Sequence, residues 1–233
     1  MNDSPQGSKG RRSPKKRGDA RQRLLEAGIE AFARFGPDEV GIRRLAAAAG
    51  VNSAALSYYF GGKQQYYRAV LRYLMRWVGQ SIRQAAMTAR AGLAASPDAC
   101  HARQLLRIFM REVVQTVLAN PQAEAVAAII WRELLRRSSG FDIVYEQMIR
   151  PVHEIITELV AAAMGVTSDD REAVLLAHSL WGQVAIFRLG FHVLRRRLKI
   201  RGRQLSNEWV ETITSTVDLV VDRLLSSPPE TRR

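Results

Sequence analysis

Residues 42–63 read IRRLAAAAGVNSAALSYYFGGK, and they contain the strongest local signals of the fold. Apolar residues recur at intervals of three and four in its first half, which predicts a short helix that Gly50 ends. Asn52 is a favourable N-cap for a second short helix, expected over residues 53–59. Two short helices joined by a tight turn have the form of a helix-turn-helix.

The segments on either side of this stretch also have helical periodicity. Apolar residues from Leu24 to Phe35 form one stripe that Gly36-Pro37 ends, and a longer helix is expected from Lys63 to about residue 91. Beyond it, turn signals divide the chain into about five more helices, near residues 98–119, 122–137, 141–163, 169–199 and 206–226. Pro151 should kink the third of these or start a new helix after Arg150. Alternation typical of strands is missing, so we predict an all-α fold.

The positive charge of the chain is concentrated near the N-terminus. The chain has 233 residues with 35 Lys and Arg against 22 Asp and Glu, a net charge of +13. Residues 1–76 contain 15 basic and 6 acidic residues, which gives +9 for this part alone. Residues 1–18 combine basic side chains with Gly, Ser and Pro, a composition typical of a disordered arm. Such an arm serves either as a solubilising tail or as an electrostatic contact to DNA.

These patterns predict four parts of the chain. A disordered basic arm over residues 1–18 precedes a three-helix domain with the helix-turn-helix over residues 19–76. A larger helical domain follows over residues 77–226, and residues 227–233 form a frayed tail.

Composition and motifs argue against several other classes of protein. The single cysteine, Cys100, excludes an internal disulfide and suits a reducing cytoplasm. The longest stretch without a charged residue, residues 173–187, is too short to span a membrane, and the N-terminus has no secretory signal. His153-Glu154 lacks the second histidine of a zinc protease motif. We therefore expect no enzyme, no metal and no cofactor.

Three segments carry a resemblance to a known family. Leu24-Leu25-Glu26-Ala27, then Ile42-Arg43-Arg44-Leu45-Ala46, then Leu56-Ser57-Tyr58-Tyr59-Phe60-Gly61-Gly62-Lys63, resemble the DNA-binding domain of the TetR family of bacterial repressors. The resemblance implies a homodimer on double-stranded DNA, a larger domain for ligand binding and dimerisation, and release from DNA when a small molecule binds. Trp131-Arg132-Glu133-Leu134, Ile149-Arg150-Pro151 and Gly182-Gln183 more loosely resemble the CecR-type branch of the family.

The resemblance also assigns DNA-contacting residues. It places Ser53, Ala54, Ala55 and Ser57 at the base edges, and Tyr58 and Lys63 at the DNA backbone. A lysine at the start of a helix adds an ammonium where free N–H groups already favour a phosphate. For Tyr58 the alternative is a ring packed between the third and fourth helices.

The chain departs from the family pattern before the second helix. The family usually has Ser or Thr there, whereas this chain has Val40-Gly41. Glycine is an acceptable cap, but the hydroxyl contact to a phosphate is lost. Arg43 or Arg44 is expected to replace it. Ser57 stands where the family commonly has Tyr, so the operator sequence does not follow from relatives.

The last two long helices are the expected dimer interface. Their small and apolar residues form stripes suited to a four-helix interface about a two-fold axis. The interface residues are Ala177, Trp181, Gly182, Ala185, Trp209, Ile213, Val217, Val220 and Leu224. The alternative is that these stripes pack within one subunit.

A cavity for an unidentified small-molecule effector is expected among the middle helices. Its bulky or polar candidates are Phe109, Met110, Trp131, Tyr145, Met148, His178, Trp181 and Phe187. Most residues of such a stripe belong to the core in helical proteins, so core packing is the alternative for each. Arg132-Glu133 forms either an internal ion pair or a ligand clamp. The basic run over residues 195–203 is either a solvated helix end or a site for an acidic partner or a membrane surface.

The sequence therefore predicts a cytoplasmic, homodimeric, sequence-specific transcriptional regulator, a repressor by resemblance to the family. The alternative is a DNA-binding architectural protein, or a helical protein at a membrane surface, that has no small-molecule effector.

Overall fold

The computed structural model describes residues 14–120, 122–136, 138–201 and 205–225, and all of their regular structure is helical. The predicted all-α fold is thereby confirmed. The described chain forms two compact units, which divide between Val70 and Leu71 inside one long helix. The predicted domain boundary lay slightly later, after Arg76. The predicted tail over residues 227–233 and most of the predicted arm lie outside the described residues.

The first unit contains three helices and the start of a fourth. They are α1 (Pro14–Glu39), α2 (Ile42–Ala48), α3 (Ser53–Phe60) and α4 (Lys63–Ala95). Helix α1 begins at Pro14 rather than near Asp19, so the prediction of a disordered arm was wrong for residues 14–18. Proline is favourable as the first residue of a helix, and the Lys and Arg residues after it have high helix propensity. The helix breaks at Gly36, where φ is 77°, and Pro37 starts a short continuation.

The core of the first unit forms where α1 meets α4. Phe32 and Tyr66 are fully buried, and the Phe32 ring lies 4.8 Å from the ring of Tyr67 in an edge-on arrangement. The Tyr66 hydroxyl donates a hydrogen bond to the Leu24 carbonyl. Burial raises the pKa of the Tyr66 phenol well above its ordinary value. These contacts form the base on which α2 and α3 are held.

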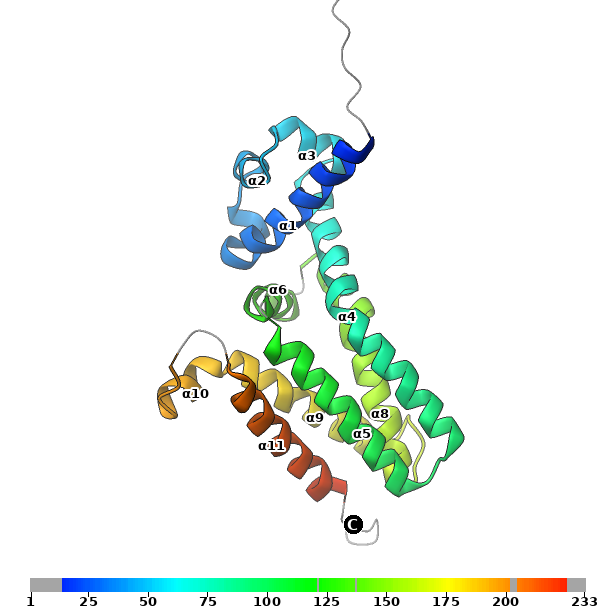
Figure 1. Ribbon diagram of the computed structural model, residues 1–233. Coiled ribbons are helices and arrows are strands. Elements are labelled where there is room, and N and C mark those ends of the chain that lie inside the picture. Colours follow the sequence, from blue (N-terminus) through cyan, green and yellow to red (C-terminus); the bar gives the residue numbers. More distant parts are fainter. Residues whose placement is uncertain (1–13, 121, 137, 202–204, 226–233) are drawn as a thin grey trace, which may run out of the picture. The chain divides into compact units, whose positions relative to one another are not determined.

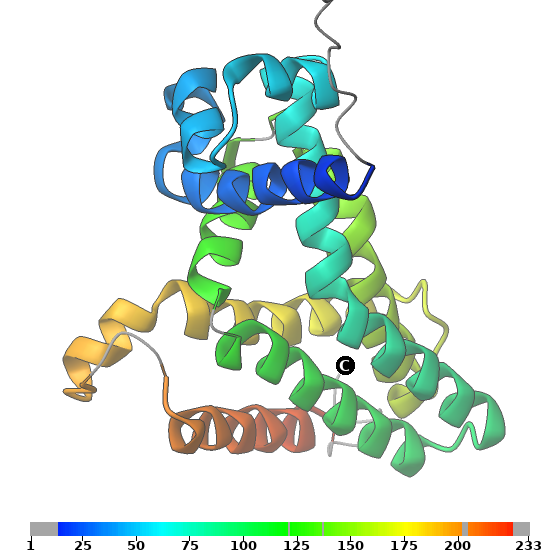
Figure 2. The same ribbon diagram turned by 45° about the horizontal axis from the view of Figure 1, so that its top comes forward.

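The second unit is a bundle of helices around α5 (Figures 1 and 2). Helix α5 packs against α8 and α11, and α8 packs in turn against α9. The helices of this unit after α4 are α5 (Ala99–Val114), α6 (Ala123–Arg136), α7 (Phe141–Val144), α8 (Arg150–Met164), α9 (Arg171–Leu189), α10 (Phe191–Arg197) and α11 (Asn207–Leu225). Two π-helical segments, η1 (Gln115–Ala119) and η2 (Tyr145–Ile149), interrupt this series.

Three predicted helices of the second unit are interrupted, and the one expected over residues 98–119 ends in η1. The helix expected over residues 141–163 contains η2, and Pro151 follows it within the first turn of α8, where a missing N–H costs little. The helix expected over residues 169–199 bends by 64° between α9 and α10. A Cβ atom at Gly190 would lie 2.9 Å from the Ile186 carbonyl oxygen, so glycine permits this close approach. Helix α10 extends away from the bundle from this bend (Figure 1).

Candidate functional site

Helix α3 is held in place by its caps and by one buried side chain. The Asn52 side chain accepts a hydrogen bond from the Ala55 amide at 2.9 Å, as expected for an N-cap. At the other end Gly61 adopts a left-handed conformation with φ of 75°, which glycine takes without strain. Leu56 is fully buried beneath the helix. The caps and this anchor fix which face of α3 is turned to solvent.

The exposed face of α3 consists of small and polar residues. Ser53, Ala54 and Ser57 are exposed, and Ala55 is half-buried. The Tyr58 side chain is 70% exposed, so the alternative of a ring packed between helices was wrong for this residue. Such a face allows close approach to base edges in a major groove, into which an α-helix fits.

Cations surround this face, and two of them already have partners. The Lys63 ammonium donates a hydrogen bond to the Asp38 carbonyl at 3.0 Å, which holds it at the first residue of α4. The Arg44 guanidinium lies over the Phe35 ring at 3.9 Å, a cation–π contact. The Arg43 guanidinium is exposed and makes no hydrogen bond or ion pair to the part of the chain that the structure describes. Gly41 caps α2 without a side-chain hydrogen bond.

A pocket in the second unit is lined almost entirely by apolar side chains. Its empty volume is about 750 Å³, including the part open to solvent. Of the predicted lining residues, Trp131, Met148 and Trp181 are present. The other lining residues are Val78, Ile82, Val113, Thr116, Val117, Asn120, Val126, Ala127, Ile130, Ile149, Val152, Val184, Ala185 and Arg188.

The other five residues predicted for the pocket lie elsewhere. Phe109 and Met110 are buried in the core of the second unit, and the half-buried Phe187 packs against that core. Tyr145 is partly exposed and stacks on Phe141. His178 is exposed and its ring lies near Trp181. Helical periodicity identifies an apolar face but does not separate residues that line a cavity from residues that fill the core, which explains these errors.

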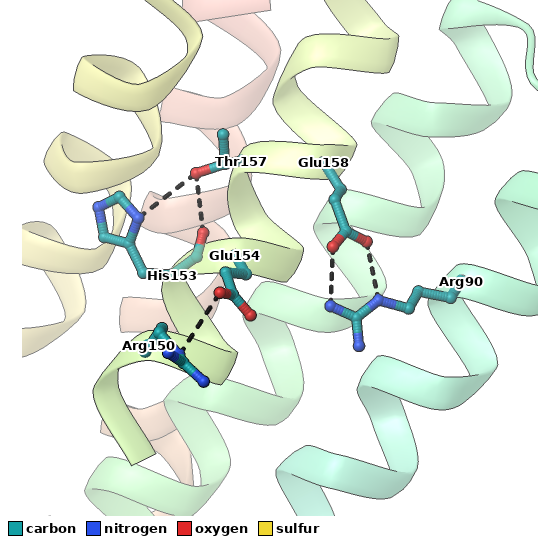
Figure 3. A network of polar contacts seen from close by, with 6 residues as sticks. All are labelled: Arg90, Arg150, His153, Glu154, Thr157 and Glu158. Atoms are coloured by element: carbon teal, nitrogen blue, oxygen red, sulfur yellow. Dashed lines mark hydrogen bonds and ion pairs between the residues drawn. The ribbon is translucent and has the colours of Figure 1, made fainter. Parts of the chain in front are cut away.

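His178 also lies beside a second histidine, with the two ring centroids 5.4 Å apart. The partner is His153 on α8. Its ring is in reach of the Thr157 hydroxyl, which donates a hydrogen bond to the His153 carbonyl at 2.8 Å (Figure 3). Burial, reinforced by His178, lowers the pKa of His153. Within the described residues no group of three or more His, Cys, Asp or Glu is placed to hold a metal ion.

Sequence reasoning missed the polar members of the pocket lining. Thr116, Asn120 and Arg188 bring a hydroxyl, an amide and a guanidinium to an otherwise apolar wall. Arg188 is half-buried, and burial lowers the pKa of its guanidinium. A signal for it was present, because Arg188 directly follows the longest uncharged stretch of the chain. A charged residue that ends an apolar helical stripe is a candidate to face a cavity.

Both π-helical segments contribute to the pocket wall. Thr116 and Val117 belong to η1, and Met148 and Ile149 belong to η2. Short π-helical segments within α-helices occur frequently at functional sites. Their presence in the wall of the same pocket supports a binding role for it.

The predicted dimer stripes pack largely inside the subunit. Ala177, Ile213 and Val217 are buried in the core of the second unit. Trp181, Val220 and Leu224 pack against this core while partly buried. Gly182, Ala185 and Trp209 are half-buried. The stripe of α11 was therefore assigned to the wrong partner for its central residues, because periodicity does not show which neighbour a helix faces.

A different set of apolar residues faces outward on the same helices. On α9, Leu175 is 67% exposed and Ile186 is 58% exposed, and on α11 Leu219 is 49% exposed. Val193 on α10 is 72% exposed. Exposed apolar residues concentrated on neighbouring helices are typical of interaction surfaces.

Two further predicted features are the Arg132-Glu133 pair and the basic run over residues 195–203. Glu133 is fully buried, and its carboxylate accepts a hydrogen bond from the Ser138 hydroxyl at 2.5 Å. The basic run begins in the last turn of α10 with Arg195, Arg196 and Arg197, where cations suit the helix dipole. Its last residue, Arg203, lies outside the described residues.

Within the described ranges no single helix has the length and apolarity needed to cross a membrane. Two bent pairs, Ala99–Ala119 with Glu124–Arg136 and Arg171–Leu189 with Phe191–Arg197, reach that length and composition only together.

Comparisons with known proteins agree on one family. The model of bacterial regulatory proteins of the tetR family matches residues 24–70, and the model of the C-terminal domain of the HTH-type transcriptional dual regulator CecR matches residues 102–227. The CecR protein of Shigella flexneri is 30% identical over 207 residues, which cover 88% of this chain and 91% of that protein. The regulator BetI of Yersinia pestis (strain Pestoides F) is 38% identical over 64 residues, 28% of this chain and 32% of BetI.

Solved structures show the same fold. A putative transcriptional regulator from Pseudomonas aeruginosa PAO1 has a TM-score of 0.67 at 19% identity, covering 93% of this chain and 94% of that one. The regulator AibR, solved with isovaleryl coenzyme A and operator DNA, has a TM-score of 0.59 at 15% identity, covering 88% of this chain and 97% of that one. The chain therefore belongs to the TetR family of bacterial transcriptional regulators and carries a C-terminal domain of the CecR type.

Proposed function

We propose that this regulator represses transcription by binding a palindromic operator as a homodimer, and that a small molecule in the pocket of the second unit releases it. The observation that carries the proposal is helix α3, which is capped at both ends, anchored by Leu56 and turned to solvent with a small, polar face. The protein is a DNA-binding regulator and, under this proposal, cytoplasmic, without a cofactor and without catalytic activity.

The proposed DNA contacts fall into two groups. Ser53, Ala54, Ala55 and Ser57 approach base edges from the exposed face of α3. Arg43, Arg44, Tyr58 and Lys63 contact phosphates. Support comes from the exposure of Tyr58 and from the position of Lys63 as the first residue of α4, where free N–H groups favour a phosphate. Residues 1–18 add a cationic arm whose effect is greatest at low salt.

Repression is the proposed sign of regulation. The Shigella flexneri relative is named a dual regulator, so activation at a second class of promoter is a distinct outcome for this chain. Operators are captured from the genome of the source bacterium, and a reporter gene is placed behind each of them. Repression predicts higher reporter expression when the regulator is deleted, and activation predicts lower expression.

A homodimer is proposed through the outward faces of α9 and α11. Their exposed Leu175, Ile186 and Leu219 supply apolar area that a second copy of the chain would cover. A two-fold dimer also presents two copies of α3, as a palindromic operator with half-sites about one helical turn apart requires.

Coupling between pocket and DNA is proposed to pass through α4. This helix begins at Lys63 and contributes Val78 and Ile82 to the pocket wall. Further along, Arg90 forms a bidentate ion pair with Glu158 of α8, at 2.7 and 2.8 Å (Figure 3). A ligand that shifts these helices therefore acts on the helix that carries the phosphate contact. The coupling free energy between two such sites is typically about 1–3 kcal/mol. The effector therefore lowers the affinity for the operator by the same factor by which the operator lowers the affinity for the effector.

Lys63→Ala tests the proposed roles of the DNA contacts. The substitution should weaken binding to all DNA sequences alike, because a phosphate contact carries no sequence information. It should also reduce the slope of log affinity against log salt by about 0.9 per lost contact in each half-site. The measurement is fluorescence anisotropy on labelled operator over a range of salt concentrations.

Ser57→Ala is the matched control for this experiment. It should alter the preference among operator variants and leave the salt slope unchanged, because Ser57 is uncharged and exposed on the recognition face. If Lys63→Ala changed the preference among operators and left the slope intact, the proposed division of roles would be wrong.

A further inference from the structure

Arg188 is the one charged residue among the described residues that line the apolar pocket. It lies in the last turn of α9, one turn beyond Val184 and Ala185, which also line the pocket. The rest of the wall consists of aliphatic side chains, two tryptophans and Met148, together with the uncharged polar residues Thr116 and Asn120. Its guanidinium is therefore a single positive group at the edge of an apolar cavity.

Within the described part of the chain, no group neutralises this guanidinium at short range. Among the residues that the structure describes, Arg188 makes no hydrogen bond and no ion pair. The acidic residue whose field reaches it is Glu124, an exposed residue in the first turn of α6. Burial acts against the charge and lowers the pKa of the Arg188 guanidinium, although arginine stays protonated in proteins. A half-buried charge without a close partner is costly unless a counter-ion binds.

We propose that the effector is an apolar organic anion whose acid group pairs with Arg188 while its apolar body lies against Trp131, Trp181 and Met148. The planar fork of a guanidinium matches a carboxylate through two parallel hydrogen bonds. The mostly apolar lining of the cavity suits an aliphatic chain or a ring system and disfavours large polar molecules. The inference rests on the proposed role of the pocket as the effector site.

Decanoate and 1-decanol provide a matched pair of ligands for the test, because they share a chain and differ in the acid group. Each is titrated against full-length protein that carries the uncharged fluorescent probe N-phenyl-1-naphthylamine, and displacement of the probe is measured. For the native protein we expect decanoate to displace the probe at lower concentration than for Arg188→Met, by about tenfold or more. Displacement by 1-decanol should differ by less than about twofold between the two proteins, because it makes no charge-assisted contact.

Three further variants make the result specific. Arg196→Met removes the same charge from an exposed position on α10 and should leave both displacements unchanged. Arg188→Lys keeps the charge and should retain a part of the response to decanoate. Ala127→Trp fills the pocket and should abolish binding of the probe. Thermal unfolding followed by circular dichroism identifies any variant that does not fold. If Arg188→Met does not fold, the comparison between the native protein and Arg188→Lys tests the role of Arg188.

The results that would overturn the anion site at Arg188 differ from those that would overturn the proposed function in DNA binding. Equal displacement by decanoate in native protein, Arg188→Met and Arg188→Lys would overturn it, and so would undiminished probe binding in Ala127→Trp. Absence of any displacement by decanoate would also overturn it. DNA affinity is measured in the same samples without ligand. Intact operator binding with any of these results refutes the anion site alone, whereas loss of operator preference in the native protein refutes the proposed function.

Discussion

Phe32→Ala is expected to destabilise the first unit by about 3–5 kcal/mol and to abolish operator binding. The Phe32 ring is fully buried and packs edge-on against Tyr67 at 4.8 Å and tilted against Tyr66 at 5.5 Å. Truncation to alanine removes these contacts and leaves a cavity between α1 and α4. Because α2 and α3 rest on this core, the recognition helix loses its support.

Hydrogen exchange followed by mass spectrometry resolves this effect by unit. Peptides from residues 20–70 should exchange faster in Phe32→Ala, while peptides from α5 and α8 keep their native rates. Phe35→Ala is the matched control, since Phe35 lies on the same helix and is half-buried under Arg44. It should cost less than Phe32→Ala because less apolar area leaves the interior. Unchanged exchange in Phe32→Ala would contradict the assigned core.

Ile186→Glu is expected to convert the proposed dimer into folded monomers. Ile186 is 58% exposed in the subunit, so a glutamate there does not disturb the core. In the proposed dimer, however, two like charges would be buried near the two-fold axis, at a cost of several kcal/mol. Operator binding should weaken strongly because a monomer contacts only one half-site.

Sedimentation velocity at micromolar concentration gives the oligomeric state directly. Met87→Glu serves as the control, because Met87 is 64% exposed on α4 and lies on neither of the proposed interface helices. Val217→Glu is unsuitable as an interface variant, since Val217 is buried and a charge there would unfold the subunit. A dimeric Ile186→Glu protein would show that the interface lies elsewhere.

The helix-turn-helix was predictable because its signals are local. Gly50, Asn52 and Gly61 each perform the conformational task that their residue type favours, so the bounds of α2 and α3 follow closely from the sequence. The resemblance to the TetR family covered the same residues. Local chemistry and family pattern agreed, and the structure confirmed both helices.

The second unit was less predictable because its features depend on tertiary packing. Nothing in the local sequence distinguishes η1 and η2 from ordinary α-helix, although both line the pocket. The bend at Gly190 could not be predicted, because an isolated glycine is tolerated within helices. The direction in which α11 faces depends on α5, whose Arg111 binds Asp218 at 2.6 Å and holds α11 on the subunit core. Such pairings between distant residues are not encoded in periodicity.

The pocket shows the same limit at the level of single residues. Phe109 and Trp131 have similar sequence surroundings, yet Phe109 fills the core and Trp131 lines the cavity. Arg188 does not belong to the pattern of aromatic residues and methionines that predicts an apolar cavity. A charge that directly follows a long apolar stretch was the better indicator of a ligand site.

A competition experiment between operator and scrambled DNA tests whether the protein recognises a specific DNA sequence. Operator fragments are first captured from the genome of the source bacterium, and the affinity of the full-length protein is then measured at physiological salt for one operator and for a scrambled duplex of the same length and composition. We expect the operator to bind about a thousandfold tighter or more, with two protected half-sites about one helical turn apart. Equal affinity for both duplexes would contradict the account and would favour an architectural or surface-binding protein without a specific operator.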